Sequence, residues 1–155
     1  MSNPIIPKVM RAVVTQPNKI LKVEEVPVPE IDDWEILVKV IAVAQNPTDH
    51  QCAYHPSHYC LCCSAFACID LDAFGNVGTI VGVDWSGLVV KLGNKVAELE
   101  PIPYKIGDHV AGFTHGSVYT DRGAYAEYVK ATYDLCWKVP DGTLTHEQAA
   151  TMGCG

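Results

Sequence analysis

The stretch Glu35–Gln45, EILVKVIAVAQ, carries the longest strand signal in the chain. Successive side chains of a strand point to opposite faces, so the stretch divides into two alternating sets. Both sets are largely apolar, which is typical of a strand that is covered on both sides. We therefore predict that this strand lies in the centre of a sheet. One face holds Ile36, Val38, Val40, Ala42 and Ala44, and the other holds Leu37, Lys39, Ile41 and Val43.

Other strand signals lie on both sides of this segment. They lie at residues 10–15, 21–26, 79–92, 109–113 and 123–130. Gly82 and Gly87 interrupt the apolar run over 79–92, which indicates bends or bulges. A turn over Lys105–Asp108 precedes the strand at 109–113. Several short strands separated by Gly and Pro turns predict a mainly β chain, built as a sandwich or a barrel.

The composition is that of an ordinary globular protein. The chain has 155 residues, enough for one domain with a core, and 48% of them are hydrophobic. Its formal net charge of −7 argues against a nucleic-acid or anionic membrane surface. No run approaches the ~20 apolar residues that a membrane helix needs. Five of the seven cysteines lie between Cys52 and Cys68, which does not suit a disulfide scaffold, so we expect a reducing, cytoplasmic location.

Four short motifs stand in a fixed order along the chain. They are QNPTD at 45–49, GVDWSGLV at 82–89, GDHVAG at 107–112 and GAYAEYV at 123–129. Together they resemble the N-terminal domain of medium-chain dehydrogenases/reductases. The resemblance implies a mainly β fold over residues 1–142, a GroES-like partly open β-barrel with a few short helices. Within the superfamily, the chain is most similar to fungal trans-acting enoyl reductases of polyketide biosynthesis.

The chain departs from the zinc-dependent alcohol dehydrogenases of this superfamily. Val83 stands where those enzymes place a zinc-binding His, and Lys91–Pro103 lacks the cysteines of their structural zinc lobe. A zinc ion polarises a carbonyl oxygen, whereas reduction of a conjugated C=C bond needs hydride at the β-carbon and donors for the enolate oxygen. The resemblance therefore implies a zinc-independent, NADPH-dependent enoyl reductase. Its substrate would be an acyl thioester on the carrier domain of a polyketide synthase, and we expect a monomer.

The resemblance assigns the NADPH contact to Pro47, Thr48, Asp49 and His50. The alternative is that Asn46–Asp49 is simply a helix-opening turn, with Thr48 or Asp49 as its cap. Tyr54 is a weak candidate proton donor, because a phenol can protonate an enolate. Three further residues are interpreted structurally: Asp84 as the cap of the bend near Gly82 and Gly87 rather than a cleft residue, and Tyr125 and Tyr128 as core or barrel-surface residues.

The segment 53–72 has no regular period and is rich in Cys, Ala and aromatic residues. It looks inserted relative to the family, and we interpret it as a retained intron or a similar gene-model scar. Transcript sequencing across codons 50 to 80 tests this interpretation, since a mature message with every codon would contradict it. The cysteines and histidines between His50 and Cys68 also suit zinc or copper(I), but their spacing matches no known structural-zinc pattern. We therefore expect no metal site.

A helix start signal lies near the end of the chain. In Thr145–Gln148, the Thr can cap the backbone and the Gln can reach back to it. We interpret residues 143–155 as the start of a helix that leads to a nucleotide-binding domain. The chain has no glycine-rich dinucleotide fingerprint, and we therefore expect that this domain is absent from it. We therefore expect an inactive fragment of a longer reductase. The alternatives are a non-catalytic β-barrel interaction module and a Cys/His metal-binding protein.

Overall fold

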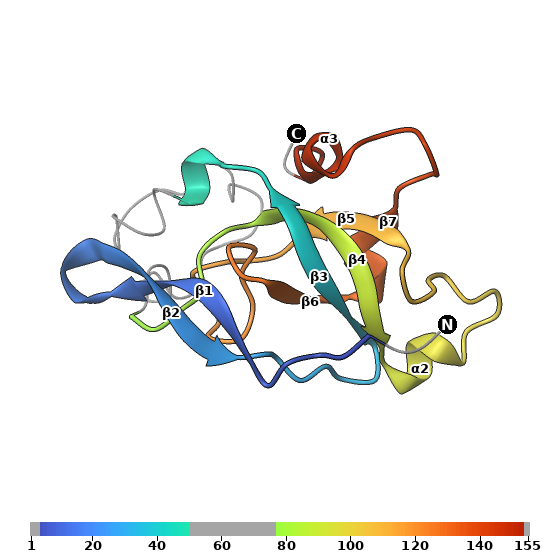
Figure 1. Cartoon of the computed structure of the whole chain (residues 1–155), viewed down its shortest axis with the longest axis horizontal. Coiled ribbons are helices and arrows are strands. Elements are labelled where there is room, and N and C mark those ends of the chain that lie inside the picture. Colours follow the sequence, from blue (N-terminus) through green and yellow to red (C-terminus); the bar gives the residue numbers. More distant parts are fainter. Residues whose placement is uncertain (1–3, 50–76, 154–155) are drawn as a thin grey trace, which may run out of the picture.

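The computed structural model describes residues 4–49 and 77–153, and they form two antiparallel sheets (Figure 1). The smaller sheet is a hairpin of β1 (Val9–Gln16) and β2 (Ile20–Pro27). The larger sheet has the strand order β6-β3-β4-β5-β7. Its strands are β3 (Glu35–Val43), β4 (Asp84–Leu92), β5 (His109–Phe113), β6 (Tyr128–Thr132) and β7 (Cys136–Lys138). The fold is mainly β, with a curled, partly open sheet and a few short helices, as the family resemblance implied.

The hairpin closes through the 3-10 turn η1 (Pro17–Lys19). Pro17 fixes the backbone at the first position, and Asn18 adopts φ of 63°, a left-handed conformation that Asn tolerates better than most residues. Single bridges from Ala12 to Ala126 and from Val14 to Ile80 attach β1 to the rest of the molecule. The contacts of β1 therefore hold the hairpin against the rest of the molecule.

The strand quoted first is central, as predicted, because β3 pairs with β6 on one side and with β4 on the other. The expected bulges also occur, since the β3–β4 register shifts between Leu37 and Val38 and again between Val40 and Ala42. Gly87 lies opposite Val40, and a Cβ at Gly87 would collide with the carbonyl oxygen of Lys39. Glycine is therefore required where these two strands approach most closely.

Three sequence predictions need correction. The outer face of β3 is buried at Glu35 and Leu37, whereas Lys39, Ile41 and Val43 on the same face are exposed. Residues 79–83 and 123–127 do not join a ladder as strands, apart from the bridges of Ile80 and Ala126. The strand β7 was not predicted, since its three residues are too few to show an alternation.

The main core lies on the inner face of the larger sheet. Trp85 and Val89 of β4, Ile36 and Val38 of β3 and Val110 of β5 are fully buried there. A second cluster holds Met10, Ala12, Val14 and Ile80 beneath the hairpin. Two crossings of the chain leave no room for a side chain, because a Cβ at Gly116 would meet the backbone of Gly82, and one at Gly123 would meet that of Ile80.

Two short helices flank the sheet, α2 (Asn94–Ala97) and α3 (His146–Ala150). The predicted start of α3 is confirmed: Gln148 N–H donates to Thr145 Oγ1 at 3.3 Å, and Thr145 N–H donates to Gln148 Oε1 at 3.0 Å. Ala149 packs against Ala111 and Val139, so α3 covers the outer face of the sheet. Among the described residues, the model contains no helix that is both long and apolar enough to cross a membrane.

Candidate functional site

A tight turn follows β3 and opens a helical turn over residues 47–49. Asp49 Oδ2 accepts the Asn46 backbone N–H at 2.8 Å, and Asp49 N–H donates to the Asn46 carbonyl oxygen at 3.1 Å. Pro47 lies at the first helical position, where its missing N–H costs nothing. Asn46 therefore occupies the cap position, rather than Thr48 or Asp49, and Asp49 closes the turn from inside the helix.

The side chain of Asn46 reaches across to β4. Its Nδ2 donates to Asp84 Oδ2 at 3.0 Å, and Ala44 N–H donates to the Asp84 backbone carbonyl oxygen at 3.2 Å. Asp84 is only 1% exposed. It therefore anchors the turn to the sheet, a structural role as predicted, although its partner is the Asn46 turn rather than the glycine bend.

Tyr125 connects the same turn to β1 and to the segment that precedes β4. Its hydroxyl donates to Asp49 Oδ2 at 2.8 Å, while its backbone bonds Val81 at 2.9 Å and Val13 at 2.8 Å. Gly82 adopts φ of 98°, and a Cβ there would collide with the Tyr125 ring and backbone. The tyrosine can approach the turn because position 82 has no side chain.

The electrostatics of this network are those of two neighbouring buried carboxylates. Burial raises the pKa of Asp49, and the charge of Asp84 adds to the increase, while the Asn46 N–H and the Tyr125 hydroxyl oppose it. Burial and the hydrogen bond to Asp49 raise the pKa of Tyr125 well above its usual range. The Tyr125 hydroxyl is therefore protonated at neutral pH and donates to Asp49. The Asp49 carboxylate is used to stabilise the turn.

Thr48 offers a polar group that the turn itself does not use. Its Oγ1 is buried and makes no hydrogen bond with the described residues, and the same is true of Asp49 Oδ1. A buried hydroxyl without a partner is costly, so a ligand that bonded it would gain affinity. A carboxamide, such as that of a nicotinamide, carries both a donor and an acceptor and fits this group.

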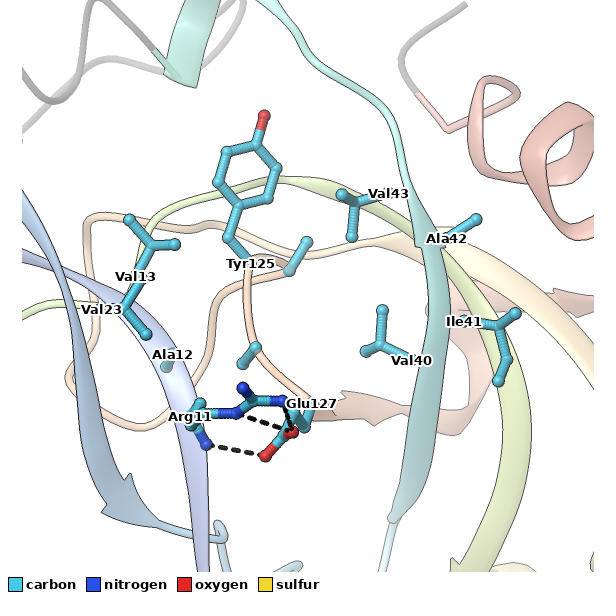
Figure 2. Close-up of a pocket in the computed structure, with 12 residues that line it drawn as sticks. Arg11, Ala12, Val13, Val23, Val40, Ile41, Ala42, Val43, Tyr125 and Glu127 are labelled. Atoms are coloured by element: carbon cyan, nitrogen blue, oxygen red, sulfur yellow. Dashed lines mark hydrogen bonds and ion pairs between the residues drawn. The ribbon is translucent and has the colours of Figure 1, made fainter.

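A largely apolar pocket of about 430 Å³ lies next to the network, between the hairpin and β3 (Figure 2). The Tyr125 ring forms part of its lining together with Val13, Val23 and Val40, while the Tyr125 hydroxyl points away from it. At the other end, Arg11 Nη2 lies 2.8 Å from Glu127 Oε1, an exposed ion pair. The lining suits a hydrocarbon chain better than a polar ligand.

The predicted site residues divide into two groups. Pro47, Thr48 and Asp49 come together at the turn, and their contact with a cofactor stays a prediction. His50 and Tyr54 lie outside the described residues, as do the insert 53–72 and the Cys/His stretch that the metal alternative needs. Among residues 4–49 and 77–153, no three His, Cys, Asp or Glu side chains are grouped closely enough to hold a metal ion.

Sequence reasoning missed Tyr125 as part of the site. It lies 76 positions after Asp49, within an alternating pattern that suits an ordinary strand. Only the folded chain shows that its hydroxyl reaches the turn.

Comparisons with known proteins agree with this architecture. The family model of the alcohol dehydrogenase GroES-like domain matches residues 32–141. The trans-enoyl reductase pydC of Acremonium sp is 40% identical over 165 residues, which cover 99% of this chain and 39% of that protein. The chain thus spans about two fifths of that relative's length.

Solved structures give the same fold. The quinone oxidoreductase of Coxiella burnetii superposes with a TM-score of 0.68 at 28% identity, over 94% of this chain and 41% of that one. Mycobacterial Rv1454c, solved as a complex with NADPH, has a TM-score of 0.64 at 24% identity, over 92% and 37%. The matched family model covers well over half of the chain, and the half-open barrel agrees with it. The chain belongs to the alcohol dehydrogenase GroES-like family, the β-barrel domain of medium-chain dehydrogenases/reductases, and resembles its trans-enoyl reductases.

Proposed function

We propose that this chain lines the substrate side of the active-site cleft in an NADPH-dependent reductase. The reductase would act on the C=C bond of an enoyl thioester. The observation that carries the proposal is the rigid turn at 46–49, which holds the unpartnered Thr48 hydroxyl in place. The family, its oxidoreductase relatives and the name of the pydC relative support the reaction type. The proposal keeps the expectations of a cytoplasmic monomer and a thioester carried by a polyketide synthase.

The residues of the chain have separate roles in this proposal. Bound NADPH would supply the hydride. Thr48 would hydrogen-bond the nicotinamide carboxamide and fix the ring, because its hydroxyl is one of two buried polar groups of the turn, with Asp49 Oδ1, that have no partner among the described residues. Asp49, Asn46 and Tyr125 would keep that hydroxyl in position without touching the reacting atoms. The apolar pocket beside Tyr125 would take the hydrocarbon part of the acyl group.

A chimera tests the proposal. The segment of pydC that matches this chain is replaced by the chain, and oxidation of NADPH by a crotonyl thioester is followed by absorbance. We expect turnover by the chimera and none by the isolated chain. In the Thr48→Val chimera, the loss of one hydrogen bond should raise KM for NADPH by about tenfold. A folded chimera without turnover contradicts the proposed reaction, while an unchanged KM contradicts only the role of Thr48.

A further inference from the structure

A serine and two histidines meet where α3 packs on the sheet. Ser86 of β4 is fully buried, and its Oγ lies 2.8 Å from His109 Nε2 of β5. The same oxygen lies 2.9 Å from Nδ1 of His146, the first residue of α3. Ser86 Oγ also donates to the carbonyl oxygen of Val110 at 3.1 Å. One hydroxyl thus joins the helix to two strands.

The protons of this cluster can be assigned by counting. Val110 contributes only an acceptor, so it takes the single hydroxyl proton of Ser86. Both imidazole nitrogens must then donate to Ser86 Oγ, which requires the Nε2–H tautomer of His109 and the Nδ1–H tautomer of His146. A neutral histidine has one N–H. The cluster is therefore fully hydrogen-bonded when both rings are neutral.

The two rings also lie against one another. The centroids of His109 and His146 are 3.8 Å apart, with an angle of 41° between the planes. Burial lowers the pKa of His109, and the nearby His146 lowers it further. Protonation would leave the bonds to Ser86 in place, since an imidazolium still donates. Its cost is the burial of charge and, when both rings are protonated, the repulsion of two stacked cations.

Of the charged groups around the cluster, Glu147 attracts a protonated His146, but none in the described part of the chain has this effect on His109. Asp108, which precedes β5, is already paired with Lys138 of β7 at 2.8 Å. Lys39 of β3 shares the cross-strand row of His109 and is itself a cation. Glu147 follows His146 on the exposed side of α3, and Asp84 lies farther along β4, near Gly153. Burial and like charge therefore dominate at His109.

Few other contacts hold α3. The helix has five residues, and its buried side chains are Ala149 and Ala150. Ala149 belongs to a small cluster with Ala111 and Val139, joined by the partly buried Trp137 and Leu144. Such a short helix depends on its tertiary contacts, so repulsion at its first residue acts directly on its docking.

We propose that Ser86, His109 and His146 form a pH-sensitive latch that holds α3 on the sheet at neutral pH and releases it in mildly acidic solution. In the docked state, the pKa of His109 lies below the ordinary value of 6.5. The undocked state therefore binds more protons as the pH falls below about 6.5, so acid favours release. Above that pH, docking has its full stability.

Amide hydrogen exchange on the full chain tests the latch. The amide of Ala149 donates to the Thr145 carbonyl oxygen at 2.9 Å and reports whether the first turn of α3 is formed. After correction for intrinsic rates, we expect its protection to fall by about tenfold or more between pH of about 7.5 and 5. Uptake of one linked proton changes the docking equilibrium by up to about tenfold for each pH unit. On the same sample, NMR titration of the ring signals of His109 should show its protonation over that range.

Variants separate the latch from general acid sensitivity. In His109→Gln, an amide can still donate to Ser86, but the ring whose pKa is lowered by burial and by His146 is lost, so most of the pH dependence at Ala149 should disappear. His115→Gln is the matched control, because the His115 ring packs edge-on against Phe113 and burial also lowers its pKa. It should retain the full dependence. Protection of Ala149 that does not change down to pH of about 5, or full dependence in His109→Gln, would overturn the proposal.

Discussion

At the scale of single residues, the turn at 46–49 is held by partners from two distant parts of the chain. Asp49 binds Tyr125, and Asn46 binds Asp84, which lies 38 positions later. The motif QNPTD predicted a turn with a cofactor-facing hydroxyl, and the turn is there. The sequence could not identify the partners, because no local pattern encodes a contact between residues so far apart.

Removal of the Tyr125 hydroxyl should weaken the turn. In Tyr125→Phe, the Asp49 carboxylate stays buried with one donor fewer, so we expect a loss of about 1–3 kcal/mol in the free energy of unfolding. Denaturant titration measures the change. Tyr128→Phe is the control, because the Tyr128 hydroxyl makes no hydrogen bond with residues 4–49 and 77–153. Equal losses in the two variants would contradict the role of the Tyr125–Asp49 bond.

The raised pKa of Asp49 gives its substitution a defined pH dependence. The folded chain binds a proton at this site more tightly than the unfolded chain, whose ordinary value is 3.8. The stabilisation from this site is full below that pH and is lost as the pH rises through the folded pKa. Asp49→Asn does not titrate, so its stability relative to wild type should improve from pH of about 3.5 to 7.

Urea unfolding across that range measures the trend, and Glu127→Gln is the control of opposite sign. Hydrogen bonds from the Arg11 backbone and side chain lower the pKa of Glu127. Its stabilisation is therefore present above the unfolded pKa and lost as the pH falls. The relative stability of Glu127→Gln should decline as the pH rises. Parallel trends in both variants would contradict the assignment for Asp49.

At the scale of elements, alternation predicted the strands that lie in long ladders. It succeeded for β2 and β3, where the strand signals at 21–26 and 35–45 coincide with the pairing. It failed over residues 123–127, which alternate in sequence but bind β1, β3 and the 80–82 segment only through scattered backbone bonds. The strand β7 escaped prediction for the opposite reason, because it is defined by pairing with β5 and not by its own three residues.

The capping box of α3 can be tested separately from its packing. Thr145→Ala removes the acceptor for the Gln148 N–H, so we expect a loss of about 1 kcal/mol. Thr145→Ser keeps an oxygen in place and should retain most of the stability. Thermal unfolding, together with the exchange rate of the Ala149 amide, measures both. A serine variant as unstable as the alanine variant would show that the methyl group, and not the cap, is what matters.

At the scale of the whole molecule, a charged network joins segments that the sheets alone do not connect. Lys130 of β6 is 6% exposed, and its Nζ lies 2.6 Å from Asp121 and 3.7 Å from Glu35 of β3. It also donates to the Glu30 carbonyl oxygen at 3.3 Å, and Arg122 completes the set through Glu35 at 3.2 Å. Composition gave only a net charge, from which no such arrangement follows.

Loss of Lys130 should therefore be costly, because Arg122 is then the one ion-pair partner left to the buried Glu35 in the described part of the chain. We expect Lys130→Ala to lose about 3 kcal/mol in the free energy of unfolding. Lys130→Met keeps the hydrocarbon stem and shows how much of the loss comes from the charge. Lys91→Ala, an exposed substitution on β4, should stay within about 0.5 kcal/mol of wild type. A loss at Lys130 no larger than that at Lys91 would show that the network is unimportant.

The crossings at Gly82, Gly116 and Gly123 restrict which sequences can adopt this fold. At each of them a Cβ would strike backbone, and a backbone atom cannot be trimmed by a second substitution. A saturation library selected for folding should therefore recover glycine at all three positions, and pairwise libraries should yield no compensating combinations. If these glycines are invariant among relatives, the reason is then the close contact between backbone segments, and their invariance is not evidence of a catalytic role.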